Sequence, residues 1–253
     1  MNRVIPFHFF LLTGLCPFTC HAAPTPPSAT TSLLQKIIDN TLAHDDAQQQ
    51  ALQSMQYDQT ADVDQLDDRD KVTHHEVLQM LISPGASPSV KIVSVIGDNI
   101  PSNPDQADAQ ATGRDVESNK QTFTLRALVN RFTIALAGED LIAGRPTYVL
   151  AFTPKSNQPY HDETGKVVNQ LQGHIWISAR TYNVLRIEAS LAHPVSIAWF
   201  LARIPTLNFH YRTQDADAGF APSQVQITLK VEALFVGFHE RQTIDMTNFR
   251  PRP

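Results

Sequence analysis

Alternation of bulky and small side chains marks the second half of the chain as strand-rich. In "GRPTYVLAFTPK", Tyr148, Leu150 and Phe152 fall on every second position, so they share one face of a strand. The residues between them, from Thr147 to Thr153, are small and uncharged. A strand with one face in water usually carries charged side chains there. The pattern therefore predicts an apolar partner for the bulky face and leaves the small face for the outer side of a sheet.

The same alternation recurs along the chain and predicts a large antiparallel sheet. The segments that carry it, in chain order, are "MQYDQTADVDQL", "KVTHHEVLQML", "SVKIVSVIG", "RFTIALAGEDLIAGRPTYVLAF", "GHIWISARTYNVLRIEASL", "PTLNFHYRT", "SQVQITLKVE" and "FHERQTIDM". Turns such as "DDRD" between the first two are too short for anything but antiparallel pairing. We expect Asn183 to occupy a turn position with positive φ. So many strands must curl or close.

Helical spacing is confined to two early segments. In "SLLQKIIDNTL", residues 32–42, Leu34, Ile37 and Ile38 fall on one stripe, and Ser32 with Gln35 fits a capping box. We expect this helix to continue towards residue 55, with a break at residues 45–46 as one possibility. "NKQTFTLRALVN" predicts a second helix. Early helices followed by strands indicate an α+β fold with helices on one face of a curved sheet.

The first residues predict export. Arg3, the apolar run from Val4 to Leu15 and the small Ala22 form the pattern of a signal peptide over residues 1–22, which we expect to be cleaved after Ala22. Cys16 and Cys20 both fall inside it. The residues before each cysteine do not fit a lipidation box, so export as a soluble protein is favoured over a lipoprotein anchor.

Three regions follow the predicted signal peptide. We expect a disordered leader over residues 23–31 and a single domain over residues 32–253. Within that domain, the polar segment 100–119 reads as a flexible insertion, with a mobile flap and a short extra helix as the alternatives. No further segment is apolar and long enough to predict a transmembrane span.

The charge balance and the motifs of the chain argue against several classes of function. The chain has 20 Lys and Arg against 25 Asp and Glu, scattered along its length, which argues against nucleic acid as a partner. It has no G-x-S-x-G elbow, and "GEDLIAGRP" lacks the Lys-Ser or Lys-Thr of a phosphate loop. In "THHE", His74 and His75 point to opposite faces of a strand, and His193, His210 and His239 lie on separate strands. We expect no catalytic residue, no metal and no cofactor, and hence no enzyme.

One group of motifs resembles a known family. The pattern is a strand ending in Phe-x-Pro, then Gly-x-Ile-Trp-Ile, a turn, and a strand that carries an arginine. Here its members are Phe152, Pro154, Gly173, Ile175, Trp176, Ile177 and Arg186. The chain in this respect resembles the outer-membrane lipoprotein-carrier (LolA/LolB-like) superfamily, and most of all its exported lipoprotein-sorting-like members. The match runs from about Leu125 to the C-terminus and is loose before it.

The resemblance implies an incomplete β-barrel whose concave face is covered by helices, with acyl chains held between sheet and helices. We therefore predict a periplasmic carrier or binder of a lipid or acylated protein, with other envelope proteins as further partners. A non-catalytic interaction or sensor domain of the cell envelope is the alternative. The residues expected to line the hydrophobic cavity are Leu34, Ile37, Ile38, Tyr148, Leu150, Phe152, Ile175, Ile177, Leu185 and Ile187. Trp176 is expected on the convex side, with the cavity as the other option.

Overall fold

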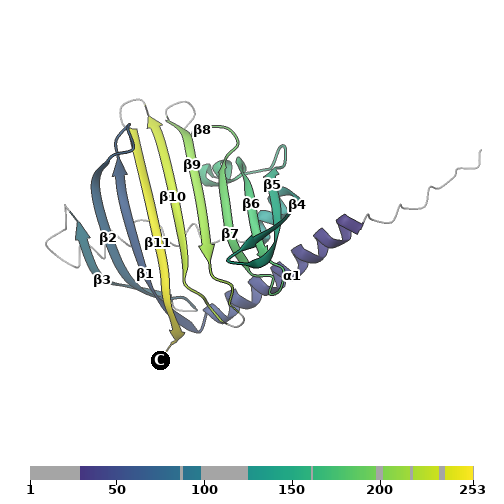
Figure 1. Ribbon diagram of the computed structural model, residues 1–253. Coiled ribbons are helices and arrows are strands. Elements are labelled where there is room, and N and C mark those ends of the chain that lie inside the picture. The colour runs from purple at the N-terminus through teal and green to yellow at the C-terminus, as the bar shows by residue number, and fades with distance from the viewer. Residues whose placement is uncertain are drawn as a thin grey trace, which may run out of the picture.

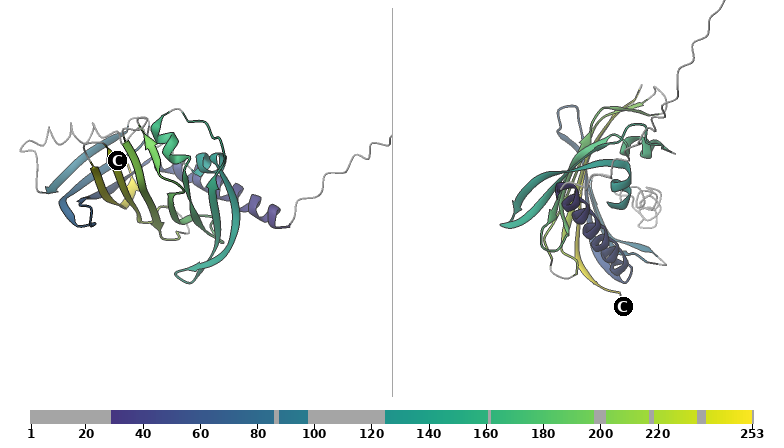
Figure 2. Two further views of the ribbon diagram at one scale, coloured as in Figure 1. Left: turned by 90° about the horizontal axis from the view of Figure 1, so that it is seen from above. Right: turned by 90° about the vertical axis from the view of Figure 1, so that its right-hand side faces the viewer.

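Within the described residues, a single curved antiparallel sheet of 11 strands forms the body of the protein and carries three helices on one of its faces (Figures 1 and 2). The computed structural model describes residues 29–85, 88–97, 125–160, 162–197, 202–216, 219–233 and 237–252. The predicted signal peptide and the segment 100–119 lie outside these residues. The fold class is as the sequence predicts: the sheet does not close into a barrel, and its edge strands are β3 and β4.

The strands follow each other in the sheet as β3-β2-β1-β11-β10-β9-β7-β6-β5-β4, and β8 pairs with β9. Their bounds are β1 (Met55–Leu66), β2 (Val72–Ser83), β3 (Ser89–Gly97), β4 (Phe132–Ile142), β5 (Arg145–Pro154), β6 (Leu171–Ser178), β7 (Val184–Leu191), β8 (Val195–Ile197), β9 (Ala202–Thr213), β10 (Ser223–Ala233) and β11 (Gly237–Pro251). Every predicted strand segment is thus a strand. The one long-range step is the pairing of β1 with β11, which joins the first hairpin to the end of the chain.

The helices differ in detail from the prediction. Helix α1 (Ala29–Leu52) begins three residues before Ser32 and runs through Asp45 and Asp46 unbroken. Ser32 therefore lies inside the helix and does not cap it, and residues 29–31 belong to α1 and not to a leader. Helix α3 (Leu125–Arg131) is the described part of the second predicted helix.

Helix α4 (Glu163–Val168) was not predicted, because its single turn and a half carries no repeated stripe. Asp162 caps its N-terminus, and the Asp162 side chain accepts a hydrogen bond from the backbone N–H of Gly165 over 2.6 Å. The helix buries Val167 and Val168.

A β-bulge overturns the prediction for Leu185. Trp176 pairs with Arg186, but the next residue, Ile177, pairs with Val184, so Leu185 is the extra residue of β7. Val184, and not Leu185, therefore packs beside Ile177 against the helices. In the turn before this strand the positive φ of 60° belongs to Tyr182, and Asn183 does not share it.

Trp176 lies on the face away from the helices, as predicted. Its neighbours in register are Val149 and Arg186, while Ile175 and Ile177 on either side of it belong to the cluster under α1. The indole N–H donates to Asp140 over 3.0 Å, and the Arg186 guanidinium lies 4.6 Å from the ring centre. We call the helix-covered face of the sheet the inner face and the other the outer face.

Candidate functional site: an apolar inner face

One unbroken row of apolar side chains crosses the whole inner face. Residues that pair across antiparallel strands project from the same face, so the register defines the row directly. Its members from β4 to β3 are Leu136, Leu150, Ile175, Ile187, Tyr211, Val225, Ile244, Ala61, Leu78 and Val95. The row one residue away on the outer face is polar over most of its length, for instance Arg212, Gln224, Asp245, Thr60 and Gln79. The sheet is therefore amphipathic from edge to edge.

The part of the inner face on β4, β5, β6 and β7, which we call the packed half, is a closed core. Leu150 is 2% exposed and Ile175 is 1% exposed, and Ile37 of α1 on top of them is fully buried. Phe132 and Phe152 meet edge to face with ring centres 5.2 Å apart. Helices α1 and α3 contribute the rest of the cover, through Leu33, Leu34, Ile38, Leu125 and Leu128.

The packed half contains nine of the ten residues predicted to line a cavity. They are brought together as expected, and Leu185 is the exception. Five of the nine are buried, and the remaining four, Leu34, Ile38, Tyr148 and Ile187, are partly buried against them. Their role in holding a ligand stays a prediction.

The part of the inner face on β1, β2, β3, β10 and β11, which we call the mixed half, is less closed. Its row members Val225, Ile244 and Leu78 are each only partly buried. The next row crosses Ile227, Gln242, Val63 and Glu76, so polar side chains interrupt the apolar surface there. The corresponding row of the packed half holds Phe152, Gly173 and Ala189. An apolar surface with polar positions between its members can bind an amphiphile, which a uniform core cannot.

The sequence contains an equally clear signal for the mixed half. The alternation of Val225, Ile227 and Leu229 with polar residues predicts an apolar face as clearly as the alternation in β5 does. What the sequence does not show is which strands lie under the apolar stripe of α1.

Helix α1 changes from apolar to polar composition where the packed half and the mixed half of the sheet meet. Its first half supplies the apolar stripe, and its second half reads "HDDAQQQ". Burial raises the pKa of the Asp45 carboxyl, and the neighbouring Asp46 adds to that rise. Burial also raises the pKa of the Tyr211 phenol, and the Asp45 charge raises it further, which places the two groups near each other. A polar pair therefore sits at the boundary between the packed and the mixed half.

Three aromatic rings close one end of the mixed half. Phe249 of β11 lies 5.1 Å from the Tyr57 ring of β1, and Phe220 stacks on Phe249 at the same distance. Tyr57 is 8% exposed, and burial raises the pKa of its phenol. The rings supply a rigid apolar wall.

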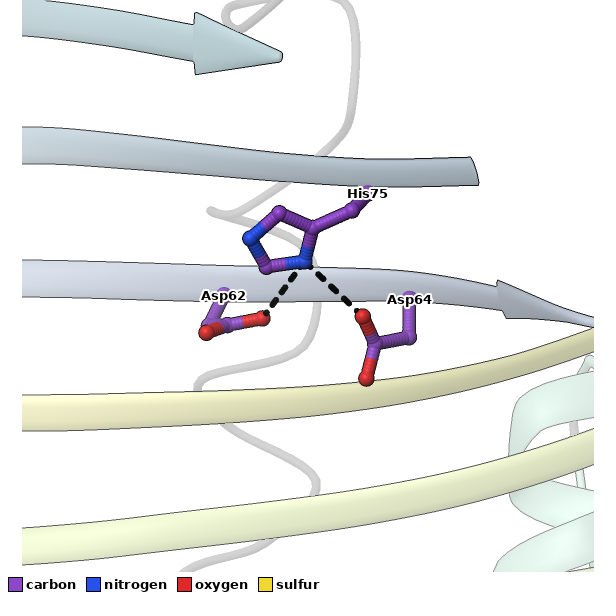
Figure 3. A group of neighbouring side chains, drawn as sticks. All are labelled: Asp62, Asp64 and His75. Carbon is purple, nitrogen blue, oxygen red and sulfur yellow. Dashed lines mark hydrogen bonds and ion pairs between the residues drawn. The ribbon is translucent and has the colours of Figure 1, made fainter. Parts of the chain in front are cut away.

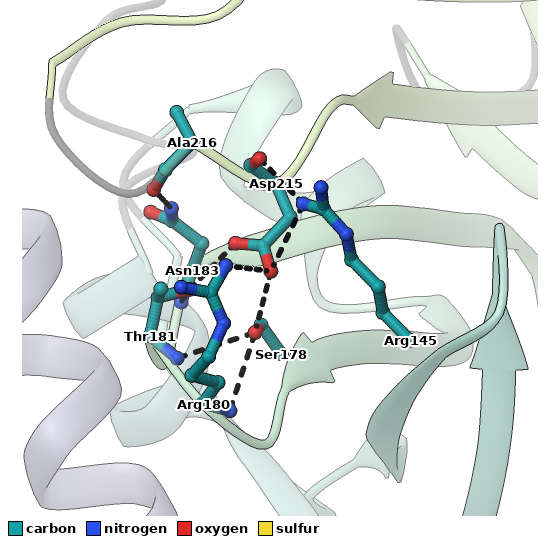
Figure 4. A network of polar contacts seen from close by, with 7 residues as sticks. All are labelled: Arg145, Ser178, Arg180, Thr181, Asn183, Asp215 and Ala216. Atoms are coloured by element: carbon teal, nitrogen blue, oxygen red, sulfur yellow. Dashed lines mark hydrogen bonds and ion pairs between the residues drawn. The ribbon is translucent and has the colours of Figure 1, made fainter.

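A buried carboxylate fixes the loops at the boundary (Figure 4). The side chain of Asp215, in the loop between β9 and β10, is 2% exposed. It accepts hydrogen bonds from Thr181 over 2.7 Å and from Ser178 over 3.0 Å. Arg180 and Arg145 approach the same oxygen to 3.3 and 3.5 Å. Burial alone would raise the pKa of Asp215, but these hydrogen bonds and the Arg180 charge outweigh it, and the pKa lies below its ordinary value.

The same network reaches helix α1. Asn183 donates its side-chain amide to the carbonyl of Ala216 over 3.1 Å, and its oxygen accepts from Gln48 of α1 over 3.1 Å. The β6–β7 turn, the β9–β10 loop and the second half of α1 are thereby tied together.

The outer face has a groove of its own, ≈ 560 Å³ in volume, that lies over Gly173. His174, Glu188 and His210 line it and form one row across β6, β7 and β9. His210 Nδ1 is 3.9 Å from Glu188. His239 is elsewhere, beside Asp67 and Asp70, so it does not join His210 in this row.

Among the described helices, none has the length and apolar content that crossing a membrane would require.

Comparisons with known proteins find structural likeness only. No protein-family model matches the sequence, and neither does any curated protein. Among solved structures, the chain is similar to a LolA superfamily protein from Nitrosomonas europaea, at 13% identity and a TM-score of 0.35, with 87% of this chain and 93% of that one covered.

Two further solved structures show a similar degree of likeness. One is an outer membrane lipoprotein-sorting protein domain from Vibrio parahaemolyticus, at 10% identity and a TM-score of 0.32, with 86% and 93% covered. The other is the MucA/MucB complex of Pseudomonas aeruginosa, at 12% identity and a TM-score of 0.28, with 85% and 99% covered. At these identities and TM-scores no ligand or residue role passes to this chain, and its fold is defined by its own strand order and packing.

Proposed function

We propose that this protein is exported and binds the acyl chain of a lipid or lipidated protein on the inner face of its sheet, without catalysing a reaction. The observation that carries the proposal is the apolar row that continues from the packed half across the mixed half. From β9 to β3 this row spans about 24 Å, since neighbouring strands lie roughly 4.8 Å apart. Its members there are mostly half-buried and so have apolar surface left to cover.

The energetics favour a chain-like apolar ligand. Each methylene that leaves water contributes about 0.8 kcal/mol. A chain that lies along the row would bury several methylenes together with the exposed parts of Val225, Ile244 and Leu78. The polar positions beside the row, Gln242 and Glu76, are placed to meet the polar end of an amphiphile.

Export supports the same function. The predicted signal peptide would deliver the protein to the periplasm, where acylated proteins and lipids must cross an aqueous space between membranes. The resemblance of the Phe152–Pro154 and Gly173–Ile177 motifs to lipoprotein carriers agrees with this compartment.

Mass spectrometry tests the proposal. The protein is purified from the periplasmic fraction of a producing cell without detergent and sprayed under native conditions. We expect a mass that begins at Ala23 together with adducts of lipid mass, which organic extraction removes. A product that keeps Cys16 or Cys20 with an added diacylglycerol would contradict soluble export, and an adduct-free protein that takes up no added fatty acid would contradict acyl binding.

One observation favours a second function. Five of the predicted cavity residues, Leu150 and Ile175 among them, are buried in the core cluster with helix α1, as in a domain that works through its surface. On that account the protein is an interaction domain of the cell envelope, and the mixed half contacts another protein instead of a lipid. Absence of lipid in the experiment above would favour this alternative.

A further inference from the structure

A histidine and two aspartates converge on the outer face where β1 pairs with β2 (Figure 3). Asp62 and Asp64 are two residues apart on β1, so both side chains project from the same face. His75 of β2 pairs with Asp64 in register. The His75 Nδ1 atom lies 2.9 Å from Oδ1 of Asp64 and 3.4 Å from Oδ1 of Asp62. One donor atom from each residue lies within 4.8 Å of the other two.

We propose that Asp62, Asp64 and His75 bind a divalent transition-metal cation of the Zn²⁺ type. Imidazole nitrogen and carboxylate oxygen are ligands that such ions take in proteins. Around a tetrahedral ion with ligands roughly 2.1 Å away, donor atoms are about 3.4 Å apart. The two nitrogen–oxygen separations here, 2.9 and 3.4 Å, already approach that spacing. Water would complete the coordination, and the site is independent of the acyl-chain function.

The arrangement suits a cation better than it suits hydrogen bonding alone. A single N–H on the His75 ring cannot point along a straight line at two carboxylates. Asp62 and Asp64 also carry like charges on neighbouring positions of one face. A cation between the three groups would accept a lone pair from each and offset both charges.

Arg241 of β11 leaves the site usable. Its guanidinium lies 2.6 Å from Oδ2 of Asp64, the oxygen that is not directed at His75. The Oδ1 atom of Asp64 therefore remains directed at His75 and into the site.

The strand register supplies a matched control. His74 precedes His75 but pairs with Gln65 and projects from the inner face. A second control is His210, in the outer-face row with His174 and Glu188. The side chains of His75 and His210 are 47% and 52% exposed, so neither substitution removes core packing.

The test is calorimetric titration of zinc chloride into the metal-free protein, prepared without a histidine tag. We expect about one equivalent of zinc to bind and to raise the unfolding temperature, since ligation to β1 and β2 favours the native state. His75→Gln and Asp62→Asn should each weaken binding by about tenfold or more, whereas His74→Gln and His210→Gln should leave it within about twofold. Circular dichroism without metal verifies that every variant is folded.

Two results would overturn the proposal. The first is an unmutated protein that binds no stoichiometric zinc. The second is a His75→Gln variant that binds zinc as tightly as His74→Gln does, or a loss that follows His210 instead.

Discussion

The packed half and the mixed half of the sheet share one apolar row but use it differently. On β5 and β6, Leu150 and Ile175 are sealed beneath Ile37 of α1. On β11 and β2, Ile244 and Leu78 continue the row with part of their surface exposed. The packed half thus behaves as the core that holds the fold together. The mixed half keeps apolar surface for a partner.

The difference is visible in the rows that flank the apolar one. In the packed half the flanking row contains Gly173 and Ala189, and the missing side chain of Gly173 lets the Glu188 carbonyl of β7 lie close to β6. In the mixed half it contains Gln242 and Glu76, which no apolar helix could cover without burying unpaired polar groups. The size and polarity of the side chains in the flanking row therefore determine which strands form part of the hydrophobic core.

Truncation of one row member in each half should give the largest contrast. Leu150→Ala leaves a cavity in a filled cluster and should lower the free energy of unfolding by about 2–5 kcal/mol. Ile244→Ala removes a partly exposed side chain and should cost about 1–1.5 kcal/mol. Urea denaturation of both variants measures the difference. Equal losses in the free energy of unfolding for the two variants would contradict the distinction between the two halves.

Glycine substitutions should sharpen the same comparison. A Cβ on Gly173 would lie 1.8 Å from the carbonyl oxygen of Glu188, so Gly173→Ala must push β6 and β7 apart. We expect a loss of about 2–3 kcal/mol. On β11 the nearest atom to a Cβ on Gly237 is 3.9 Å away, and Gly237→Ala should change stability by less than about 0.5 kcal/mol. Thermal unfolding of the two variants tests this; a tolerated Gly173→Ala would show that the packed half is looser than its exposure indicates.

Acid should act on the loops at the boundary between the two halves through Asp215. Its folded-state pKa lies below the ordinary value of 3.8, so the ionised carboxylate stabilises the fold at any pH well above 3.8. That stabilisation is lost as the pH falls below 3.8 towards the folded-state pKa. Asp215→Asn should cost about 1–2 kcal/mol at neutral pH and should reduce the acid sensitivity of unfolding.

A matched control for Asp215 lies in the mixed half. Arg250 and Asn248 hold the pKa of Asp58 below its ordinary value, but its side chain is 43% exposed, so solvent screens the interaction. Asp58→Asn should therefore change the pH profile of unfolding less than Asp215→Asn does. A larger change for Asp58→Asn than for Asp215→Asn would show that the Asp215 network at the boundary does not stabilise the fold.

Much of the fold could be predicted because strand alternation is a local signal. The bulky face of Tyr148, Leu150 and Phe152 and the outward position of Trp176 both follow from the period of two. Leu185 could not be placed, since a one-residue bulge reverses every face after it. The pairing of β1 with β11 could not be predicted from the sequence either. It joins residues such as Asp58 and Arg250 that are far apart in sequence.

The candidate site was harder to predict than the fold. Periodicity shows which residues face inward, but not whether a helix fills the space above them. The chosen residues were those nearest to the family motif, and these lie under α1. In sequence His75 is next to His74, while its partners in space are Asp62 and Asp64 of the adjacent strand.

The central claim is that the mixed half binds an acyl chain, and titration of a fluorescent fatty acid tests it most directly. Leu78→Asp places a charge in the apolar row, and Gln79→Asp places the same charge one residue away on the outer face. We predict that Leu78→Asp weakens probe binding by about tenfold or more, which corresponds to roughly 1.4 kcal/mol, and that Gln79→Asp leaves it unchanged. Equal binding by both variants, or no binding by the unmutated protein, would contradict the account.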